Sequence, residues 1–170
     1  METKDIIIEN YDAKKYQDAI KNFDCGNFNL NNFLKFADEI GTTFLFVESA
    51  TGAVVGYISF ACGGLKLDKY VSPAIEVKLF AVDKKYQSKI DKESNRTYAY
   101  FYFRSFIEYF RSISRDTIKA DYVILHSLDD KSTHFYEKFD FKKFSNKDDQ
   151  KKVLVGNFEI DCTPMYFAID

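Results

Sequence analysis

The stretch Ile75–Gln87, which reads IEVKLFAVDKKYQ, constrains the fold more than any other part of the chain. Alternate residues of its first half are apolar, as in a strand with one buried side, and these are Ile75, Val77, Leu79 and Ala81. A polar turn ends the strand, and apolar residues at helical spacing begin about ten residues later. Loop and helix N-terminal N–H groups bind anions, so this strand, loop and helix predict a site for a phosphorylated ligand.

Length and composition indicate a single globular domain over residues 1–170. Hydrophobic residues make up 46% and charged residues 29%, as is usual for a globular protein. The 18 Phe and 12 Tyr have two readings: aromatic platforms that stack on bases, or the codon bias of an AT-rich genome. The net charge of −2 does not by itself require a polyanionic partner.

The chain carries no pattern typical of export or of a membrane. Its three cysteines have no C-x-x-C spacing, which favours free thiols over a disulfide framework or a zinc site. The N-terminus is acidic with only a short apolar run, and no window reaches the roughly 20 apolar residues of a membrane span. We therefore expect a cytoplasmic protein that needs no metal and contacts no membrane.

Periodicity predicts the element order β-α-α-β-β-β-α-β-α-β-β. The expected strands are 5–9, 42–48, 53–62, 75–82, 120–125, a short one from 141 and a last one over 158–169. The expected helices are 12–20, 29–41, 94–114 and 129–138. The pair Gly63-Gly64 should end the third strand, and Ser72-Pro73 should lie in a loop. The β-α-β unit from Ile75 to Leu125 should be parallel, within a mixed sheet that has helices on both faces.

This order and six phrases of the sequence resemble the GNAT superfamily of acetyl-CoA-dependent N-acetyltransferases. The likeness is to its branch of small bacterial proteins, which includes toxins that acetylate the amino group of aminoacyl-tRNA. The six phrases span nearly the whole chain in family order and are FDCG with LNNFL (23–34), VVGY (54–57), LFAVD with YQ (79–87), LDD (128–130), FYEKFDF (135–141) and TPMY (163–166).

The resemblance implies an α/β (α+β) GNAT fold: a mixed, mostly antiparallel sheet of 6–7 strands, splayed between the fourth and fifth. It also implies acetyl transfer from acetyl-CoA to a primary amine by direct attack. The pantetheine of acetyl-CoA would pair with the main chain of Phe80, Ala81 and Val82. Tyr136 would act as the acid that protonates the departing CoA thiolate. The structural alternative for Tyr136 is a core tyrosine with a satisfied hydroxyl.

The segment that should hold the pyrophosphate departs from the family, because Gln87–Thr97 contains no glycine. Glycines normally let backbone N–H groups approach the phosphates. Cations, hydroxyls and amides offer replacements, and the expected cofactor-binding residues here are Gln87, Ser88, Lys89, Ser94, Asn95, Arg96 and Thr97, with Lys92 as a further cation. The alternative is a non-catalytic GNAT-fold protein that has lost CoA and binds another macromolecule.

The remaining predictions concern the base and the partners. Glu76 could accept a proton from the amine through a water; an ion pair with Lys78 or plain solvation is the structural alternative. The resemblance makes tRNA and an antitoxin-like protein candidate partners, and a homodimer is one possible assembly. Binding of tRNA would need a basic face, for which the candidates are Lys14, Lys15, Lys21 and Lys35.

Overall fold

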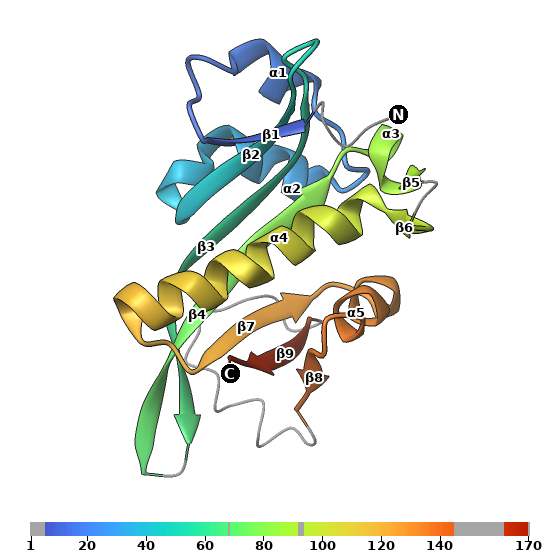
Figure 1. Cartoon of the computed structure of the whole chain (residues 1–170). Helices are drawn as coiled ribbons and strands as arrows, with labels where there is room; N and C mark the ends of the chain where they lie inside the picture. Colours follow the sequence, from blue (N-terminus) through green and yellow to red (C-terminus); the bar gives the residue numbers. More distant parts are fainter. Residues whose placement is uncertain (1–5, 68, 92–93, 145–161, 170) are drawn as a thin grey trace. The chain divides into compact units, whose positions relative to one another are not determined.

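The computed structural model describes residues 6–67, 69–91, 94–144 and 162–169 (Figure 1). The chain divides into two compact units: unit 1 is 1–60 with 78–105, and unit 2 is 61–77 with 106–170. The strands hydrogen-bond in the order β1-β2-β3-β4-β7-β9-β8, and a separate pair, β5-β6, forms a hairpin. The seven-stranded sheet confirms the predicted fold class, whereas the single-domain assignment stays a prediction.

Unit 1 contains the N-terminal strands. Strand β1 (Ile6–Asn10) pairs antiparallel with β2 (Thr42–Glu48), and β2 pairs antiparallel with β3 (Val54–Leu67). The register of β2 against β3 shifts at Phe46/Val47, opposite Gly56. A Cβ on Gly56 would lie 2.9 Å from the carbonyl oxygen of Ala81 on β4 (Tyr70–Val82), so only glycine fits at this close backbone approach.

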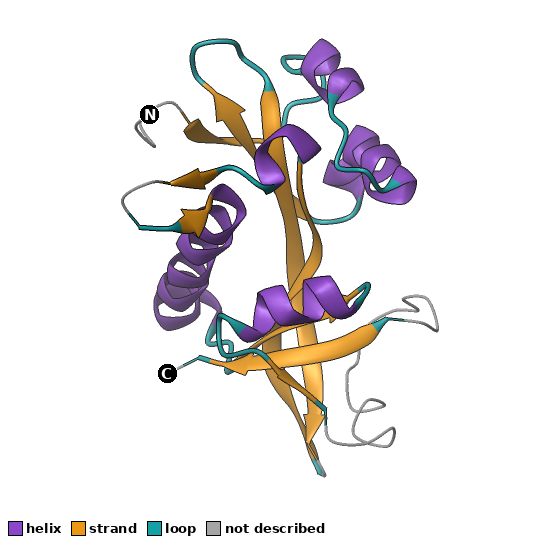
Figure 2. Ribbon diagram, turned by 90° about the vertical axis from the view of Figure 1, so that its right-hand side faces the viewer, coloured by secondary structure: helices purple, strands orange, loops and turns teal. Residues whose placement is uncertain are grey.

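Helices cover both faces of the unit 1 sheet (Figure 2). On one face, α1 (Gln17–Asn22), α2 (Phe28–Phe33) and the 3₁₀ helix η2 (Leu34–Glu39) pack on a core that includes Leu79 and Ala81. On the other face lies α4 (Tyr98–Ile113), whose Phe103 ring is 5.0 Å from that of Phe80. The predicted alternation of β4, with Leu79 and Ala81 on one side and Phe80 on the other, is confirmed.

Unit 2 holds the remaining strands. Its short elements are the π-helical turn η3 (Ser114–Ile118), β7 (Tyr122–Ser127), α5 (Asp130–Glu137), β8 (Lys142–Lys143) and β9 (Thr163–Ala168). β4 pairs parallel with β7, from Ala74 with Tyr122 to Val77 with Leu125, as predicted. β9 pairs antiparallel with both β7 and β8.

Two predicted breaks in the β3–β4 region are wrong. β3 continues through Gly63 and Gly64 to Leu67. Gly63 does not mark a break: a Cβ there would lie 3.1 Å from the Glu76 Cβ on β4, so the glycine makes room for that side chain. β4 begins at Tyr70, so Pro73 lies inside a strand. Pro73 immediately precedes Ala74, the first residue of the β4–β7 ladder, so its missing N–H removes no hydrogen bond from that ladder.

Helix boundaries also differ from the predictions. α1 begins at Gln17, because the Asp12 carboxylate accepts from the N–H groups of Lys14 and Lys15 and holds a turn there. The predicted helix 29–41 is broken by non-helical angles at Phe36. α4 begins at Tyr98, since the preceding residues form a hairpin. Of the predicted last strand, 158–161 lie outside the described residues.

Candidate functional site

The end of β4 is the best defined part of the candidate site, and it lies in unit 1. The N–H of Asp83 donates to the carbonyl of Val55 on β3 at 2.9 Å. Main-chain groups alternate in direction along a strand, so those of Ala81 face β3 while those of Phe80 and Val82 point away from it. Among the described residues the β4–β7 ladder ends at Val77, before this segment. Phe80 and Val82, but not Ala81, can therefore present main-chain groups to a ligand.

The side chain of Gln87, at the end of α3 (Lys84–Gln87), ties the end of β4 to the turn before α2. Its Nε2 donates to the carbonyls of Val82 and Cys25, both at 2.8 Å. The Val82 carbonyl is thus already hydrogen-bonded, and the amide donor predicted for the cofactor has a structural use. Gln87 positions the site rather than offering this donor to a ligand.

A polar network around Asp24 holds the same turn. The Asp24 carboxylate accepts from Lys84 Nζ, from Gly26 N at 2.9 Å and from Asn31 Nδ2 at 3.0 Å. Asp24 N in turn donates to Asp83 Oδ2 at 3.1 Å. The hydrogen bond from Lys84, then those from Gly26 and Asn31, lower the pKa of Asp24 from 3.8 to about 2. The sequence shows that this turn is rich in Asn and Asp. It does not show that Asp83 and Lys84, 59 and 60 residues further along the chain, are the partners of Asp24.

The glycine-free segment forms a β-hairpin, β5 (Ile90–Asp91) with β6 (Arg96–Thr97). Asn95 has a φ of 53°, the left-handed conformation that a glycine would otherwise supply. Asp91 Oδ2 accepts from Ser94 N at 2.9 Å and from Ser94 Oγ at 2.6 Å. The Ser94 donors predicted for a phosphate are therefore used within the hairpin.

Two cations of this segment have no acidic partner among the described residues. Lys89 Nζ lies 3.9 Å from the ring centre of Tyr86, and the Arg96 guanidinium lies 5.1 Å from that of Tyr100. The hydroxyl of Thr97 caps α4 by accepting from Tyr100 N at 3.3 Å. Ser88, which follows α3, is exposed, and Lys92 lies outside the described residues. Lys89, Arg96 and the start of α4 are thus the parts of the hairpin best suited to an anion.

Glu76 lies in unit 2 and is only 2% exposed, which excludes plain solvation as its role. It is directly opposite Ile124 in the β4–β7 ladder, and a Cβ on Gly63 would lie 3.1 Å from the Glu76 Cβ. Gly63 thus makes room for this side chain. A glycine within an apolar strand is the sequence signal that could have found this contact.

Tyr136 lies in α5 of unit 2 and is 8% exposed. Burial raises the pKa of its phenol, and the negative charge of Asp129 adds to the effect. Its ring packs against those of Phe135 at 5.3 Å and Phe141 at 6.0 Å, between centres. A tyrosine with a raised pKa keeps its proton at neutral pH, which a general acid requires.

Glu76 and Tyr136 project from opposite faces of the unit 2 sheet. Thr133 of α5 hydrogen-bonds Ser127 at 2.6 Å, which places α5 on the face of β7 that bears Ser127 and Leu125. Glu76 shares the other face with its neighbour Ile124. The fold does not bring the two predicted catalytic side chains together on one face.

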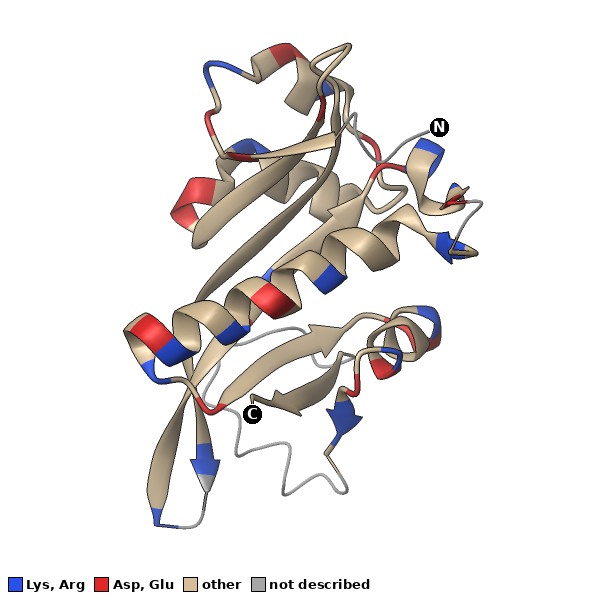
Figure 3. Ribbon diagram, in the orientation of Figure 1, with Lys and Arg blue, Asp and Glu red and all other residues tan. Residues whose placement is uncertain are grey.

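Two of the four lysines of the predicted basic face have acidic partners. Lys15 pairs with Glu9, and Lys21 lies 3.7 Å from Asp18. Basic and acidic residues alternate over this part of the ribbon (Figure 3). The Lys14, Lys15, Lys21 and Lys35 set is therefore not a uniformly positive surface.

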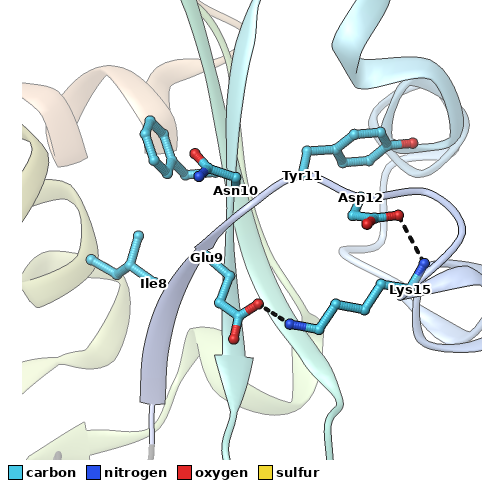
Figure 4. A pocket seen from close by; sticks show the side chains of 7 residues that line it. Ile8, Glu9, Asn10, Tyr11, Asp12 and Lys15 are labelled. Atoms are coloured by element: carbon cyan, nitrogen blue, oxygen red, sulfur yellow. Dashed lines mark hydrogen bonds and ion pairs between the residues drawn. The ribbon is translucent and has the colours of Figure 1, made fainter.

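An open pocket of about 470 Å³ lies beside the same segment, lined by Ile8–Asp12, Lys15 and Phe44 (Figure 4). Its one cation, Lys15, is paired with Glu9, which also accepts from the hydroxyl of Tyr16. The hydrogen bonds from Lys15 and Tyr16 lower the pKa of Glu9. None of the predicted catalytic or cofactor-binding residues lines this pocket.

No group of three or more His, Cys, Asp or Glu side chains among the described residues is arranged to hold a metal ion. No described helix is long and apolar enough to cross a membrane.

Several solved structures of toxins share the fold of this chain. A tyrosine-to-phenylalanine variant of the toxin AtaT, bound to the C-terminus of the antitoxin AtaR and acetyl-CoA, matches with a TM-score of 0.70 and 16% identity over 97% of this chain and 94% of that one. AtaT complexed with acetyl-methionyl-tRNAfMet matches at 0.67 and 16%, over 96% and 95%. A tyrosine-to-phenylalanine variant of KacT matches at 0.72 and 17%, over 97% and 95%.

No family model matches the sequence, and no curated protein does so either. At 16–19% identity the structural matches define the fold, and that fold is the GNAT fold that the sequence predicted.

Proposed function

We propose that this chain is an acetyl-CoA-dependent N-acetyltransferase that moves an acetyl group to a primary amine by direct attack. The observation that carries the proposal is the end of β4, where the main chain of Phe80 and Val82 points away from β3 beyond the β4–β7 ladder. Strand addition at such a segment suits the amide-rich pantetheine arm. The structures of AtaT with acetyl-CoA, which share this fold, support the assignment of the co-substrate.

The end of β4 and the hairpin after Gln87 differ in how well they suit acetyl-CoA. The β4 end needs to supply only main-chain groups, whereas the hairpin offers Lys89 and Arg96 in place of a glycine-rich loop. Acetyl-CoA would supply the activated acyl group. Tyr136 would hold a proton for the departing thiolate, because burial keeps its phenol protonated. Glu76 stays our candidate to accept the amine proton through water.

The finer proposal for the acceptor is the amino group of an aminoacyl-tRNA, supported by the AtaT complex with acetyl-methionyl-tRNAfMet. An antitoxin-like protein partner has similar support in the AtaT–AtaR complex. With these substrates we propose a cytoplasmic location, and a homodimer is our assembly hypothesis. If tRNA binds through phosphates, its affinity should fall steeply with salt; binding that ignores salt would contradict this part of the proposal.

One observation favours a second candidate, a GNAT-fold binding protein without CoA. The Asp91 carboxylate and its bonds to Ser94 lie in the hairpin where phosphates would have to bind. Such a protein would show no transfer to any amine.

The test of the proposed function is acetyl transfer by the full chain, followed by mass spectrometry. Purified protein is incubated with acetyl-CoA and a panel of amines that includes aminoacyl-tRNAs and free amino acids. We expect at least one amine to gain about 42 Da, the mass that one acetyl group adds when it replaces a hydrogen. No adduct on any amine, from a protein that is folded, would favour the second candidate.

A further inference from the structure

The hydroxyl of Tyr86, on α3, donates to a carboxylate 38 residues earlier in the chain. Its acceptor is Oε1 of Glu48, the last residue of β2, at 3.1 Å. Both side chains are half-buried, and a hydrogen bond is stronger where water is partly excluded. Burial, and then the hydrogen bond to Glu48, raise the pKa of the Tyr86 phenol, which therefore keeps its proton and stays a donor at neutral pH. Both residues belong to unit 1.

The Glu48 carboxylate is also held by the turn between β2 and β3. Its Oε2 accepts from Thr51 Oγ1 at 2.6 Å, and the same Thr51 oxygen accepts from Ala53 N at 3.2 Å. The main chain of Glu48 closes this turn, since its N–H donates to the Ala53 carbonyl at 2.9 Å and its carbonyl accepts from Gly52 N at 2.8 Å. Both carboxylate oxygens thus have a partner, and the acceptor of the Tyr86 hydroxyl is fixed to the sheet.

The ring that Glu48 holds lies against the ammonium group of Lys89, whose Nζ is 3.9 Å from the ring centre of Tyr86. A phenol that donates to a carboxylate gains negative charge on its ring, which strengthens its attraction for a cation above the ring. The main chain of Lys89 is held as well. Its N–H donates to the Tyr86 carbonyl at 3.2 Å, and its carbonyl accepts from the N–H of Tyr98, the first residue of α4, at 3.0 Å.

The tyrosine between the two charges leaves the ammonium group available to an anion. Lys89 is exposed and has no acidic partner among the described residues. A direct ion pair with Glu48 would compete with a phosphate for the same ammonium group, whereas a ring contact leaves its hydrogen-bond donors free. A lysine that already lies over a ring also loses less side-chain entropy when a ligand fixes it.

We propose that Glu48 and Tyr86 are positioning residues for the pyrophosphate of acetyl-CoA. The Glu48 carboxylate holds the Tyr86 ring, and the ring holds the Lys89 ammonium group where the phosphates would bind. This chain of contacts would partly replace the glycine-rich loop, because it prepares a side-chain cation rather than main-chain N–H groups. The inference rests on the proposed function, since it assumes that acetyl-CoA is bound and that Lys89 contacts its phosphates.

The neighbouring Tyr102 of α4 offers a matched control. Its ring stacks on that of Phe46 with 4.5 Å between centres, and it is 7% exposed. Its hydroxyl has no hydrogen-bond partner among the described residues. The substitution Tyr102→Phe therefore removes a phenol oxygen from the same unit without breaking a bond of Glu48 or Tyr86.

The test is calorimetry of acetyl-CoA into the full chain, with the wild type, Tyr86→Leu, Tyr86→Phe, Glu48→Gln and Tyr102→Phe. Each of the first three substitutions is also made in a Lys89→Ala background, which gives double-mutant cycles. Tyr86→Phe keeps the ring and Glu48→Gln keeps an acceptor of nearly the same shape, so both should fold even if Tyr86→Leu does not. Circular dichroism and thermal unfolding verify the fold of every variant.

We expect Tyr86→Leu to raise the Kd of acetyl-CoA by about 2- to 5-fold, and Tyr86→Phe and Glu48→Gln by about 2-fold. Tyr102→Phe should leave it unchanged. In the Lys89→Ala background none of the three substitutions should raise the Kd further, because the cation that they position is gone. A residue that only stabilised the hairpin would weaken binding in both backgrounds.

Three results would overturn this inference while leaving acetyl-CoA binding intact. They are an unchanged Kd in Tyr86→Leu or Glu48→Gln, an equal rise in Tyr102→Phe, and equal fold-changes with and without Lys89. Absence of acetyl-CoA binding by the wild type is a different result, since it overturns the proposed function and this inference with it.

Discussion

Unit 1 and unit 2 carry candidate residues of different kinds. In unit 1 the candidates are main-chain groups at the end of β4 and two cations on tyrosine rings, which are means of holding a ligand. In unit 2 they are two buried titratable side chains, Glu76 and Tyr136, which are means of moving protons. The proposed function thus assigns binding and chemistry to different sets of residues. Changes in unit 1 should alter affinity for acetyl-CoA, and changes in unit 2 should alter the rate of transfer.

Tyr136→Phe should have the largest effect. It removes one oxygen and keeps the ring that packs on Phe135 and Phe141, so the fold and the affinity for acetyl-CoA should be unchanged. Loss of a general acid lowers kcat by about 100-fold or more. Steady-state kinetics and calorimetry on the same preparation measure the two quantities. The control is Tyr122→Phe, on the other face of the unit 2 sheet; an unchanged rate in Tyr136→Phe would remove this residue as the acid.

Lys89→Ala with Arg96→Ala should show the converse pattern. Removing two cations that have no acidic partner among the described residues should raise the Kd for acetyl-CoA by up to about 30-fold, since each exposed charge pair contributes up to about 1 kcal/mol and 1.4 kcal/mol is tenfold. At saturating acetyl-CoA the kcat should stay near that of the wild type. The control is Lys66→Ala, which removes one positive charge from unit 2 and should change neither the Kd for acetyl-CoA nor kcat. An unchanged Kd in the double variant would show that the hairpin does not hold the pyrophosphate.

Gly56→Ala tests whether the β4 end must be held in place. The new Cβ would lie 2.9 Å from the Ala81 carbonyl and 3.0 Å from Phe46, so backbone must move, at a cost of about 1–3 kcal/mol in the free energy of unfolding. Because the strain falls on β4, affinity for acetyl-CoA should weaken as well. Urea unfolding measures the first effect and calorimetry the second.

Gly52→Ala is the comparison for this change, because its φ of 70° costs about 1 kcal/mol while the space around it is open. If Gly56→Ala is no more destabilising than Gly52→Ala, the close approach of β3 to β4 is not needed for the fold.

Asp24→Asn should have the smallest effect, and one that depends on pH. The folded-state pKa of Asp24 is about 2, below its ordinary 3.8, so the native protein favours the ionised form. This contribution to stability is complete above about pH 4 and is lost as the pH falls towards 2. The variant should therefore be less stable than the wild type at pH 7, and the difference should shrink on acidification. Urea midpoints at pH 7 and near pH 3 measure it; a difference that grows towards low pH would contradict the assigned shift.

The parts of the molecule that were predictable from the sequence are those governed by alternation. Leu79, Ala81 and Phe80 lie on the expected faces of β4, because burial of one side of a strand imposes a period of two. The helix expected over 129–138 is present as α5, which Asp129 caps by accepting from Ser132 N at 2.7 Å. Local chemistry decides such features, and a single sequence contains it.

Features that depend on distant residues were not predictable. β3 passes through Gly63-Gly64, and Gly63 makes room for the Glu76 side chain on the next strand. The segment after Gln87 was expected to be a loop, and it forms a hairpin. Its turn has Asn95 at positive φ, and a glycine at this position would have indicated the turn. The helix expected over 29–41 is interrupted, because its geometry changes at Leu34 and Phe36 has non-helical backbone angles. Each case turns on a contact or a backbone angle that residue type alone does not specify.

The central claim is that this GNAT fold binds acetyl-CoA despite its glycine-free hairpin. Isothermal titration calorimetry of acetyl-CoA into the full wild-type chain tests it most directly. The account predicts saturable binding with a Kd of about 1–100 µM, corresponding to roughly −8 to −5.5 kcal/mol. No heat of binding with acetyl-CoA at millimolar concentration, from a protein that is folded, would contradict it.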